Sequence, residues 1–266
     1  MKIGFIGTGN MGGALARVAA KGGHTLLLAN RTPAKAAALA KELGGTVCPN
    51  AEAAEKAELL FLGVKPQGLP GLAGELAPVL QARKGNAPVV VSMATAVTLR
   101  ELDAMLGGGL PLIRIMPNTP AAVGAGTILY AAQNVTDAQL NAFRAVLAQA
   151  GLLLPLLEEK IDAASAISGC GPAFCFQFAD ALALGGVRAG LSYPDACRLA
   201  AQTMLGAAEM LLQGGEAPDV LKMRVCSPAG TTIEGVLALE QGGFSYTVQN
   251  AVTAAYRRTV EMTRKG

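Results

Sequence analysis

The chain lacks tryptophan and contains a single histidine, His24, in 266 residues. Charged residues account for 15% of the sequence, whereas about 25% is usual in globular proteins. The net charge is only +3, the basic residues are scattered and aromatic residues make up 4%, so no nucleic-acid partner is expected. The shortage of charge instead predicts that much of the surface is hidden, as it is between the subunits of an oligomer.

The five cysteines are an odd number, and none of them has the pair spacing of a metal site. One histidine cannot complete such a site, so we expect no metal and predict reduced, buried thiols in a cytoplasmic protein. The longest uncharged run, residues 115–136, contains prolines and polar side chains and is too interrupted to span a membrane. The first predicted strand begins at Lys2, so we also expect no targeting segment before the fold.

Up to about residue 155, short apolar runs alternate with helical patterns, which is typical of an α/β Rossmann-type fold with a doubly wound, mainly parallel sheet. The predicted strands are residues 2–6, 25–29, 59–64, 89–92 and 112–116. Two further runs, residues 128–131 and 152–156, predict edge strands that flank a helix over about 136–149.

From Glu158 onward the strand pattern disappears, and helices follow one another with glycine or proline between them. We therefore predict two domains, residues 1–157 and an all-α domain of residues 158–266. Within the helix over residues 195–212 the polar side chains fall on one narrow stripe. Because a helix this apolar needs neighbours on several sides, we predict an intertwined helical dimer.

Residues 7–12 read Gly-Thr-Gly-Asn-Met-Gly, directly after an apolar strand and at the start of a helix. In this context the first glycine permits a tight turn, the second lets the backbone approach a pyrophosphate, and the third allows close packing of helix and strand. The positive end of the helix dipole adds to the attraction. We therefore expect a dinucleotide here; the alternative is a glycine-rich structural turn.

The second strand ends Ala29-Asn30-Arg31, where an NAD-selective fold usually carries Asp or Glu for the ribose hydroxyls. No carboxylate stands there, and a guanidinium pairs well with a 2′-phosphate. The sequence therefore predicts a preference for NADP(H), with NAD(H) as an alternative cofactor. The other interpretation is a helix cap followed by a solvated arginine. Lys65 follows another strand and is either a cofactor contact or a solvated loop lysine.

A second unusual stretch, residues 227–232, reads Ser-Pro-Ala-Gly-Thr-Thr between two helical segments. Pro228 ends one helix and Thr231 or Thr232 begins the next, so backbone N–H groups at that start are available to a carboxylate or phosphate. Taken alone, the stretch is more simply an ordinary helix cap after a proline stop.

With both ends in view, the chain resembles the pyrroline-5-carboxylate reductases over essentially its whole length. The resemblance rests on residues 5–11, 64–67, 116–120, 168–173 and 225–232. It implies a Rossmann domain that binds NAD(P)H, followed by an all-helical dimerisation domain, and homodimers that often assemble into decamers. It also implies the reduction of 1-pyrroline-5-carboxylate to L-proline, the last step of proline biosynthesis.

Matched position by position, the resemblance implies that the cofactor contacts Ile6, Gly7, Thr8, Gly9, Asn10, Met11, Asn30, Arg31, Asn50, Val64, Lys65, Met93 and Ala94. It implies that the substrate contacts Glu158, Ser227, Gly230, Thr231 and Thr232. A cyclic imine can be protonated by water, so little acid–base machinery is needed and positioning should carry most of the catalysis. We expect N–H groups of residues 230–232 to hold the carboxylate. Thr232, the implied catalytic residue, should orient the ring nitrogen, because a hydroxyl is too weak an acid.

Three places depart from the family pattern. Cys170 stands where the family usually has Ser, Ala229 stands where a glycine is common, and residues 94–96 read Ala-Thr-Ala instead of Ala-Ala-Gly. We expect these small-for-small changes to alter loop geometry rather than the reaction.

Two other turns have more than one interpretation. Asn118 and Thr119 either line the nicotinamide pocket or form a purely structural turn. Residues 168–172 separate two helices with small side chains, and we expect them to serve close helix packing.

Two alternative functions remain open from the sequence. A β-hydroxyacid dehydrogenase shares the same plan but needs a catalytic lysine in the helical domain, where Lys160, Lys222 and Lys265 are the candidates. A non-catalytic NADP(H)-binding sensor or scaffold would keep the nucleotide site and lack turnover.

Overall fold

The computed structural model describes residues 1–263 and divides the chain into two compact units. The first unit comprises Met1–Cys170 and the C-terminal stretch from Ala255 onward. The second unit comprises Gly171–Ala254. The predicted boundary near residue 157 stays a prediction, since the helix that begins at Glu158 packs within the first unit.

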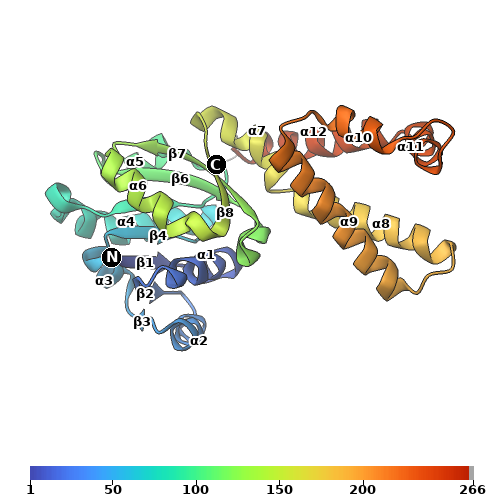
Figure 1. Cartoon of the computed structure of the whole chain (residues 1–266). Coiled ribbons are helices and arrows are strands. Elements are labelled where there is room, and N and C mark those ends of the chain that lie inside the picture. Colours follow the sequence, from blue (N-terminus) through green and yellow to red (C-terminus); the bar gives the residue numbers. More distant parts are fainter. Residues whose placement is uncertain (264–266) are drawn as a thin grey trace. The chain divides into compact units, whose positions relative to one another are not determined.

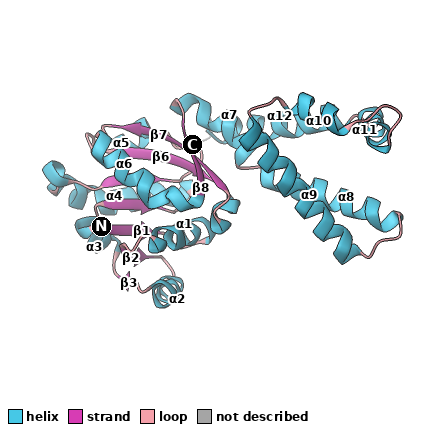
Figure 2. Cartoon of the chain, viewed as in Figure 1, coloured by secondary structure: helices cyan, strands magenta, loops and turns pink. Residues whose placement is uncertain are grey.

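An eight-stranded sheet forms the centre of the first unit (Figures 1 and 2). Its strands are β1 (Lys2–Ile6), β2 (Thr25–Ala29), β3 (Thr46–Val47), β4 (Leu59–Leu62), β5 (Val89–Ser92), β6 (Leu112–Pro117), β7 (Gly126–Gln133) and β8 (Gly151–Pro155). They lie in the order β3-β2-β1-β4-β5-β6-β7-β8, and each pairs in parallel with its neighbours except for the antiparallel pair β6 and β7. The predicted doubly wound, mainly parallel sheet is confirmed.

Helices cover both faces of this sheet. They are α1 (Asn10–Lys21), α2 (Pro33–Leu43), α3 (Asn50–Lys56), α4 (Leu69–Ala82), α5 (Leu99–Met105), α6 (Asp137–Leu147) and α7 (Glu158–Ser168). Apolar side chains of α1, α2 and α6 form one core with one face of the sheet, and those of α3, α4, α5 and α7 form a second core with the other face. Strands such as β4 and β5 are buried throughout because both of their faces are covered, which explains why their sequences are continuous apolar runs.

The strand predictions are confirmed with small shifts at their ends. The strand predicted over 59–64 ends at Leu62, because Gly63 turns the chain toward the next loop. The apolar pattern of the sequence does not predict the two-residue strand β3, since both of its side chains are exposed. Four short 3-10 turns complete the unit: Pro66–Gly68, Lys84–Asn86, Thr119–Val123 and Ala148–Ala150.

The second unit is helical. Its helices are α8 (Gly171–Arg188), α9 (Tyr193–Gly214), α10 (Pro218–Val225), α11 (Thr231–Gln241) and the first part of α12 (Phe244–Thr263). Helices α8 and α9 pack side by side (Figure 1). Many of their apolar side chains nevertheless face solvent in the single chain, among them Phe176, Leu199 and Leu212, which is 81% exposed. This exposure is what the narrow polar stripe predicts for a helix that lacks its partner chain.

One helical stretch of the described residues, Glu158–Arg188, is long and apolar enough to cross a membrane by length and composition. A turn at Gly169 and Cys170 interrupts it, and it begins with two acidic residues, Glu158 and Glu159. Only 6% of its most apolar window is buried in the single chain, so the stretch also has the exposure expected of a subunit interface.

Candidate active site

The predicted cofactor residues gather along one edge of the sheet. They lie in the loops that follow the carboxyl ends of β1, β2, β3, β4 and β5, or at the ends of those strands. The strand order reverses between β1 and β4, and open α/β sheets bind ligands in the crevice at such a reversal. The chain's one histidine, His24, precedes β2 and lies at the opposite edge, so it takes no part in this site.

The glycine-rich loop between β1 and α1 is tightly packed. The N–H of Gly7 donates to the carbonyl of Ala29 at 2.8 Å, and the N–H of Gly63 donates to that of Ile6 at 2.7 Å. Gly7 has a φ of +99°, and a Cβ there would collide with the Gly63 carbonyl, while a Cβ at Gly12 would collide with the Gly7 carbonyl. Only glycine therefore allows the loop, strand and helix to come this close.

The same loop offers an open cradle for an anion. Helix α1 begins directly after Gly9, and no side chain caps its start. A Cβ built on Gly9 would meet no atom within 4 Å. The buried hydroxyl Oγ1 of Thr8 has no hydrogen-bond partner among the described residues. A pyrophosphate requires unpaired N–H groups, open space beside the backbone and a free hydroxyl donor. This loop supplies all three, so the residues present fit a dinucleotide.

Asn30 joins two loops of the site. Its Oδ1 accepts from the N–H of Thr8 at 3.1 Å, and its Nδ2 donates to the carbonyl of Thr32 at 3.0 Å. The amide therefore ties the glycine-rich loop to the loop after β2. The neighbouring Arg31 is exposed, and its guanidinium has no recorded hydrogen bond or ion pair within residues 1–263. Contact of either residue with a cofactor stays a prediction.

A cavity of about 440 Å³ opens beside Asn30 at the carboxyl ends of β2 and β3. Its apolar walls are Ala29, Pro33, Ala36, Val47 and Pro49. The predicted cofactor residue Asn50 lies at its rim together with Glu75, which the sequence did not single out. Its volume lies in the range of small-molecule sites.

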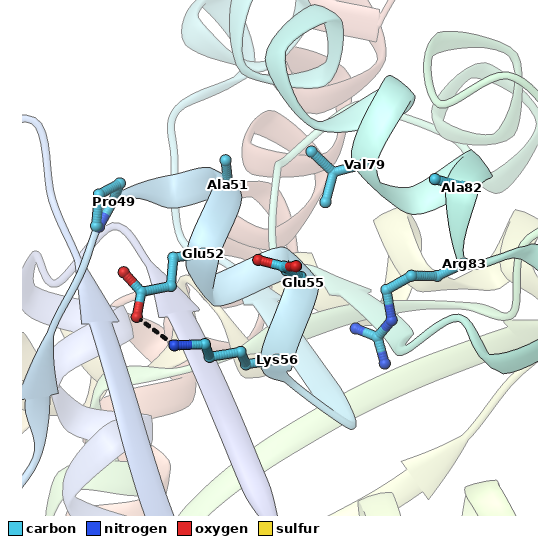
Figure 3. A pocket seen from close by; sticks show the side chains of 8 residues that line it. All are labelled: Pro49, Ala51, Glu52, Glu55, Lys56, Val79, Ala82 and Arg83. Carbon is cyan, nitrogen blue, oxygen red and sulfur yellow. Dashed lines mark hydrogen bonds and ion pairs between the residues drawn. The ribbon is translucent and has the colours of Figure 1, made fainter.

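A second cavity, which is larger at about 640 Å³, lies between α3 and α4 (Figure 3). Three of its four charged lining residues have partners: Lys56 pairs with Glu52 at 2.7 Å, and Arg83 donates to the carbonyl oxygens of Ala54 and Ala57. No predicted site residue lines this cavity. Its lining residue Arg83 lies between the end of α4 and the start of β5, whereas the predicted site residues follow the carboxyl ends of the strands. We therefore do not assign the active site to it.

The remaining cofactor positions follow β4 and β5, whose ends pair in register at Leu62 and Ser92. Val64 is partly buried and Lys65 is exposed, while Ala94 is buried, with 1% of its surface exposed. The N–H of Ala94 donates to the hydroxyl of Ser92, the last residue of β5, at 3.3 Å. Cofactor contacts at these positions stay predictions.

Asn118 forms a structural turn. Its Nδ2 donates to the Ser168 carbonyl at 2.8 Å, and its Oδ1 accepts from the N–H of Thr127 at 2.8 Å. Both ends of this buried amide are thus used to join β7 and the end of α7 to the end of β6. Of the two interpretations of this turn, the structural one has direct support, and Thr119 begins the short helical turn that follows.

Glu158 also lies within a structural network. Its Oε1 accepts from the N–H of Leu99 at 2.7 Å and lies 3.4 Å from the guanidinium of Arg114. Arg114 is buried and pairs at 2.5 Å with Asp162. The network holds α5 and α7 against β6, and the assignment of Glu158 to the substrate stays a prediction. The one sign of this network in the sequence is Arg114 itself, a lone charged residue within the apolar strand β6. Its partners Glu158 and Asp162 lie 44 and 48 residues away in the chain.

In the second unit, residues 227–232 separate α10 from α11 as predicted. Helix α11 begins at Thr231, and no side chain caps it. Ala229 adopts a φ of +55°, and Ser227, Thr231 and Thr232 are exposed. The residue before the helix is Gly230, which has no side chain to cap it, so anion binding at the start of α11 stays a prediction beside the simpler interpretation of a helix cap. The lysines Lys160 and Lys222 are exposed on α7 and α10, and Lys265 lies outside the described residues.

Comparison with known proteins gives matches over the whole chain. Residues 158–262 match the family model for pyrroline-5-carboxylate reductase dimerisation, and residues 2–96 match a model for NADP oxidoreductases, coenzyme F420-dependent. A pyrroline-5-carboxylate reductase of Synechocystis sp. is 39% identical over 100% of this chain and 99% of its own length.

Solved structures agree with these matches. The structure of a pyrroline-5-carboxylate reductase from Coxiella burnetii has a TM-score of 0.89 and 32% identity over 97% of both chains. A crystal structure of Plasmodium falciparum pyrroline carboxylate reductase with NADP bound has a TM-score of 0.86 and 30% identity over 99% of both chains. The second part of the chain is thus a dimerisation domain, which makes the protein a homo-oligomer. The chain belongs to the pyrroline-5-carboxylate reductase family.

Proposed function

We propose that this chain reduces 1-pyrroline-5-carboxylate to L-proline, with NADPH as the preferred reductant and NADH as an alternative. The observation that carries the proposal is the open, uncapped start of α1 with the unsatisfied Thr8 hydroxyl, in a chain related over its full length to reductases of this substrate. The NADP bound to the Plasmodium falciparum relative supports the choice of cofactor.

The reaction consumes one cyclic imine, one NADPH and one proton, and it yields L-proline and NADP⁺. When bound, NADPH supplies a hydride from C4 of its dihydronicotinamide. The imine nitrogen takes its proton from water, so the chain needs no side-chain acid. This agrees with a site that has no histidine, because His24 lies at the other edge of the sheet.

The cofactor is held by backbone and side-chain groups of the first unit. The N–H groups of residues 9–12 and the Thr8 hydroxyl hold the pyrophosphate, and Arg31 pairs with the 2′-phosphate. Residues 64–65 and 93–94, which follow the carboxyl ends of β4 and β5, contact the nicotinamide half.

The substrate is held by residues 227–232. Backbone N–H groups of Thr231 and Thr232 bind its carboxylate, because no side chain of this segment caps them. The N–H of Gly230 donates to the carbonyl of Ser227 at 3.0 Å and closes the turn before the helix. The Thr232 hydroxyl hydrogen-bonds the ring nitrogen and fixes the orientation of the C=N bond. Positioning of this kind contributes by removing rotational freedom before the reaction rather than by proton transfer.

The functional form is a homodimer, and a decamer built from five dimers is the higher assembly we propose. The exposed apolar surface of α8 and α9 supplies the dimer contact. The cysteines are unpaired in the described residues and the substrate is a central metabolite, which supports a cytoplasmic location.

Oxidation of NADPH by the purified chain tests the proposal. Addition of 1-pyrroline-5-carboxylate should remove the dihydronicotinamide absorbance and form an equal amount of L-proline, and the same assay with the six-membered cyclic imine carboxylate measures the preference for ring size. Binding of NADPH without turnover of either imine would instead identify a nucleotide-binding sensor.

A further inference from the structure

The cavity next to Asn30 has one charged group among its lining residues. Apolar side chains form most of the wall, and the buried Cys48 contributes a thiol whose pKa is raised by burial and secondarily by the carboxylate of Glu52. Glu75 of α4 supplies the charge, and no lysine or arginine lines this cavity in the described part of the chain. The formal charge that these lining residues contribute is therefore that of a single carboxylate.

Glu75 is fixed in this position by Asn50. Nδ2 of Asn50 donates to Oε2 of Glu75 at 2.9 Å, which leaves Oε1 without a recorded partner among residues 1–263. Because Asn50 begins α3 and Glu75 lies on α4, the bond joins two elements across the rim of the cavity. One carboxylate oxygen is thus used to position the group, and the other is available to a ligand.

A carboxylate at this place favours one form of the cofactor over the other. It accepts hydrogen bonds and cannot donate them, so it attracts a ribose hydroxyl and repels a phosphate. NAD-binding folds usually take this carboxylate from the end of β2. Here the residue after β2 is Asn30, whose amide is bound to Thr8 and Thr32, and the carboxylate comes from α4 instead.

We propose that Glu75 is a specificity-determining residue of the cofactor site. Its carboxylate, held by Asn50, accepts a hydrogen bond from a ribose hydroxyl of NADH and repels the 2′-phosphate of NADPH. It thereby limits the preference for NADPH that Arg31 creates. The inference rests on the proposed function, because it requires that the adenosine half of the cofactor binds in this cavity.

Glu75→Gln removes the charge with little change of shape. A glutamine Oε1 still accepts from Asn50, so the link between α3 and α4 is kept. Glu55→Gln is the matched control, because it removes the same charge from the other cavity, shown in Figure 3. Asn50 donates to Glu75 and not to Glu55, so this control leaves the link between α3 and α4 unchanged.

Calorimetric titration with ADP-ribose and with 2′-phospho-ADP-ribose measures the effect on binding without turnover. Glu75→Gln should strengthen binding of the phosphorylated fragment by about three- to tenfold at low salt and weaken binding of ADP-ribose by about twofold. Arg31→Ala should shift the ratio of the two affinities in the opposite direction. Glu55→Gln should change that ratio by less than about 1.5-fold.

The outcomes separate this inference from the proposed function. A ratio that changes no more in Glu75→Gln than in Glu55→Gln overturns the role of Glu75, while fragment binding and turnover of 1-pyrroline-5-carboxylate still support the reductase. Absence of fragment binding to the unmodified chain overturns both. Fragment binding without any turnover overturns the reductase alone, and the affinity ratio still decides the role of Glu75.

Discussion

At the scale of single residues, two alanines adopt the left-handed conformation that normally requires glycine. Ala96 has a φ of +62° in the loop after β5, and Ala229 has a φ of +55° before α11. Both stand where the family resemblance led us to expect glycine. Two of the three places that depart from the family pattern are therefore strained at the departures themselves, and both of these loops contain predicted site residues.

Ala96→Gly should raise the thermal stability. Left-handed alanine costs about 1 kcal/mol, and the greater freedom of glycine in the unfolded chain offsets roughly half of that. We expect the Tm to rise by about 1–2 °C in calorimetry. Ala94→Gly is the control, since Ala94 is buried and its φ is not positive, and it should lower the Tm. An equal drop in both variants would refute the strain.

Thr232→Ala tests the orientation of the ring nitrogen. Loss of one hydrogen bond that aligns the C=N bond should lower kcat/KM by one to two decades, with about 1.4 kcal/mol for each decade. Binding of the cofactor fragments should stay unchanged, because the cofactor residues lie in the first unit. Unaltered kcat/KM for 1-pyrroline-5-carboxylate would reject this role of Thr232.

At the scale of elements, two helices of the first unit begin with the same capping arrangement but different chemistry. In α5 the Glu101 carboxylate accepts from the N–H of Thr98 at 2.7 Å, and in α6 the Gln139 amide oxygen accepts from the N–H of Thr136 at 2.9 Å. The bond from the Thr98 N–H, followed by that from its hydroxyl, lowers the pKa of Glu101 below its ordinary value. Only the α5 cap therefore depends on pH.

Glu101→Ala should destabilise the protein at pH 7 by about 0.5–1 kcal/mol. Because the folded-state pKa is lowered, this stabilisation is complete above the unfolded pKa of about 4.3 and is lost as the pH falls through the folded value. The difference in Tm from the unmodified protein should thus shrink in acid. Gln139→Ala should show a difference that does not vary with pH, and the same acid response in both variants would contradict the account.

The sequence predicts the elements of the first unit well because burial on both faces leaves continuous apolar runs, as in β4 and β5. It does not reveal β3, whose two side chains are exposed. The sequence also does not predict which residues far apart in the chain form hydrogen bonds or ion pairs with each other. The bonds of Asn118 to Ser168 and of Arg114 to Asp162 join residues 50 and 48 positions apart, and only the folded chain identifies them.

The candidate site was predicted more fully at its glycine-rich loop than at its cavity. The loop is local in sequence, so the spacing of its glycines already describes its geometry. Glu75 had no local signal, since α4 brings it to Asn50 from 25 residues away.

At the scale of the whole molecule, the exposed apolar helices require a partner. The apolar surface of α9 includes Leu199, Leu205 and Leu212, each more than half exposed in the single chain. Light scattering at micromolar concentration should therefore give an even multiple of the 27.0 kDa chain mass. A mass equal to one chain would contradict the dimer.

The most direct test of the reductase follows a labelled hydride. Incubation of the chain with 1-pyrroline-5-carboxylate and NADPH carrying deuterium at the transferred position of C4 should give L-proline with one deuterium at C5, detected by mass spectrometry. Unlabelled proline, or no proline despite binding of NADPH, would contradict the transfer of hydride from the cofactor to the imine carbon.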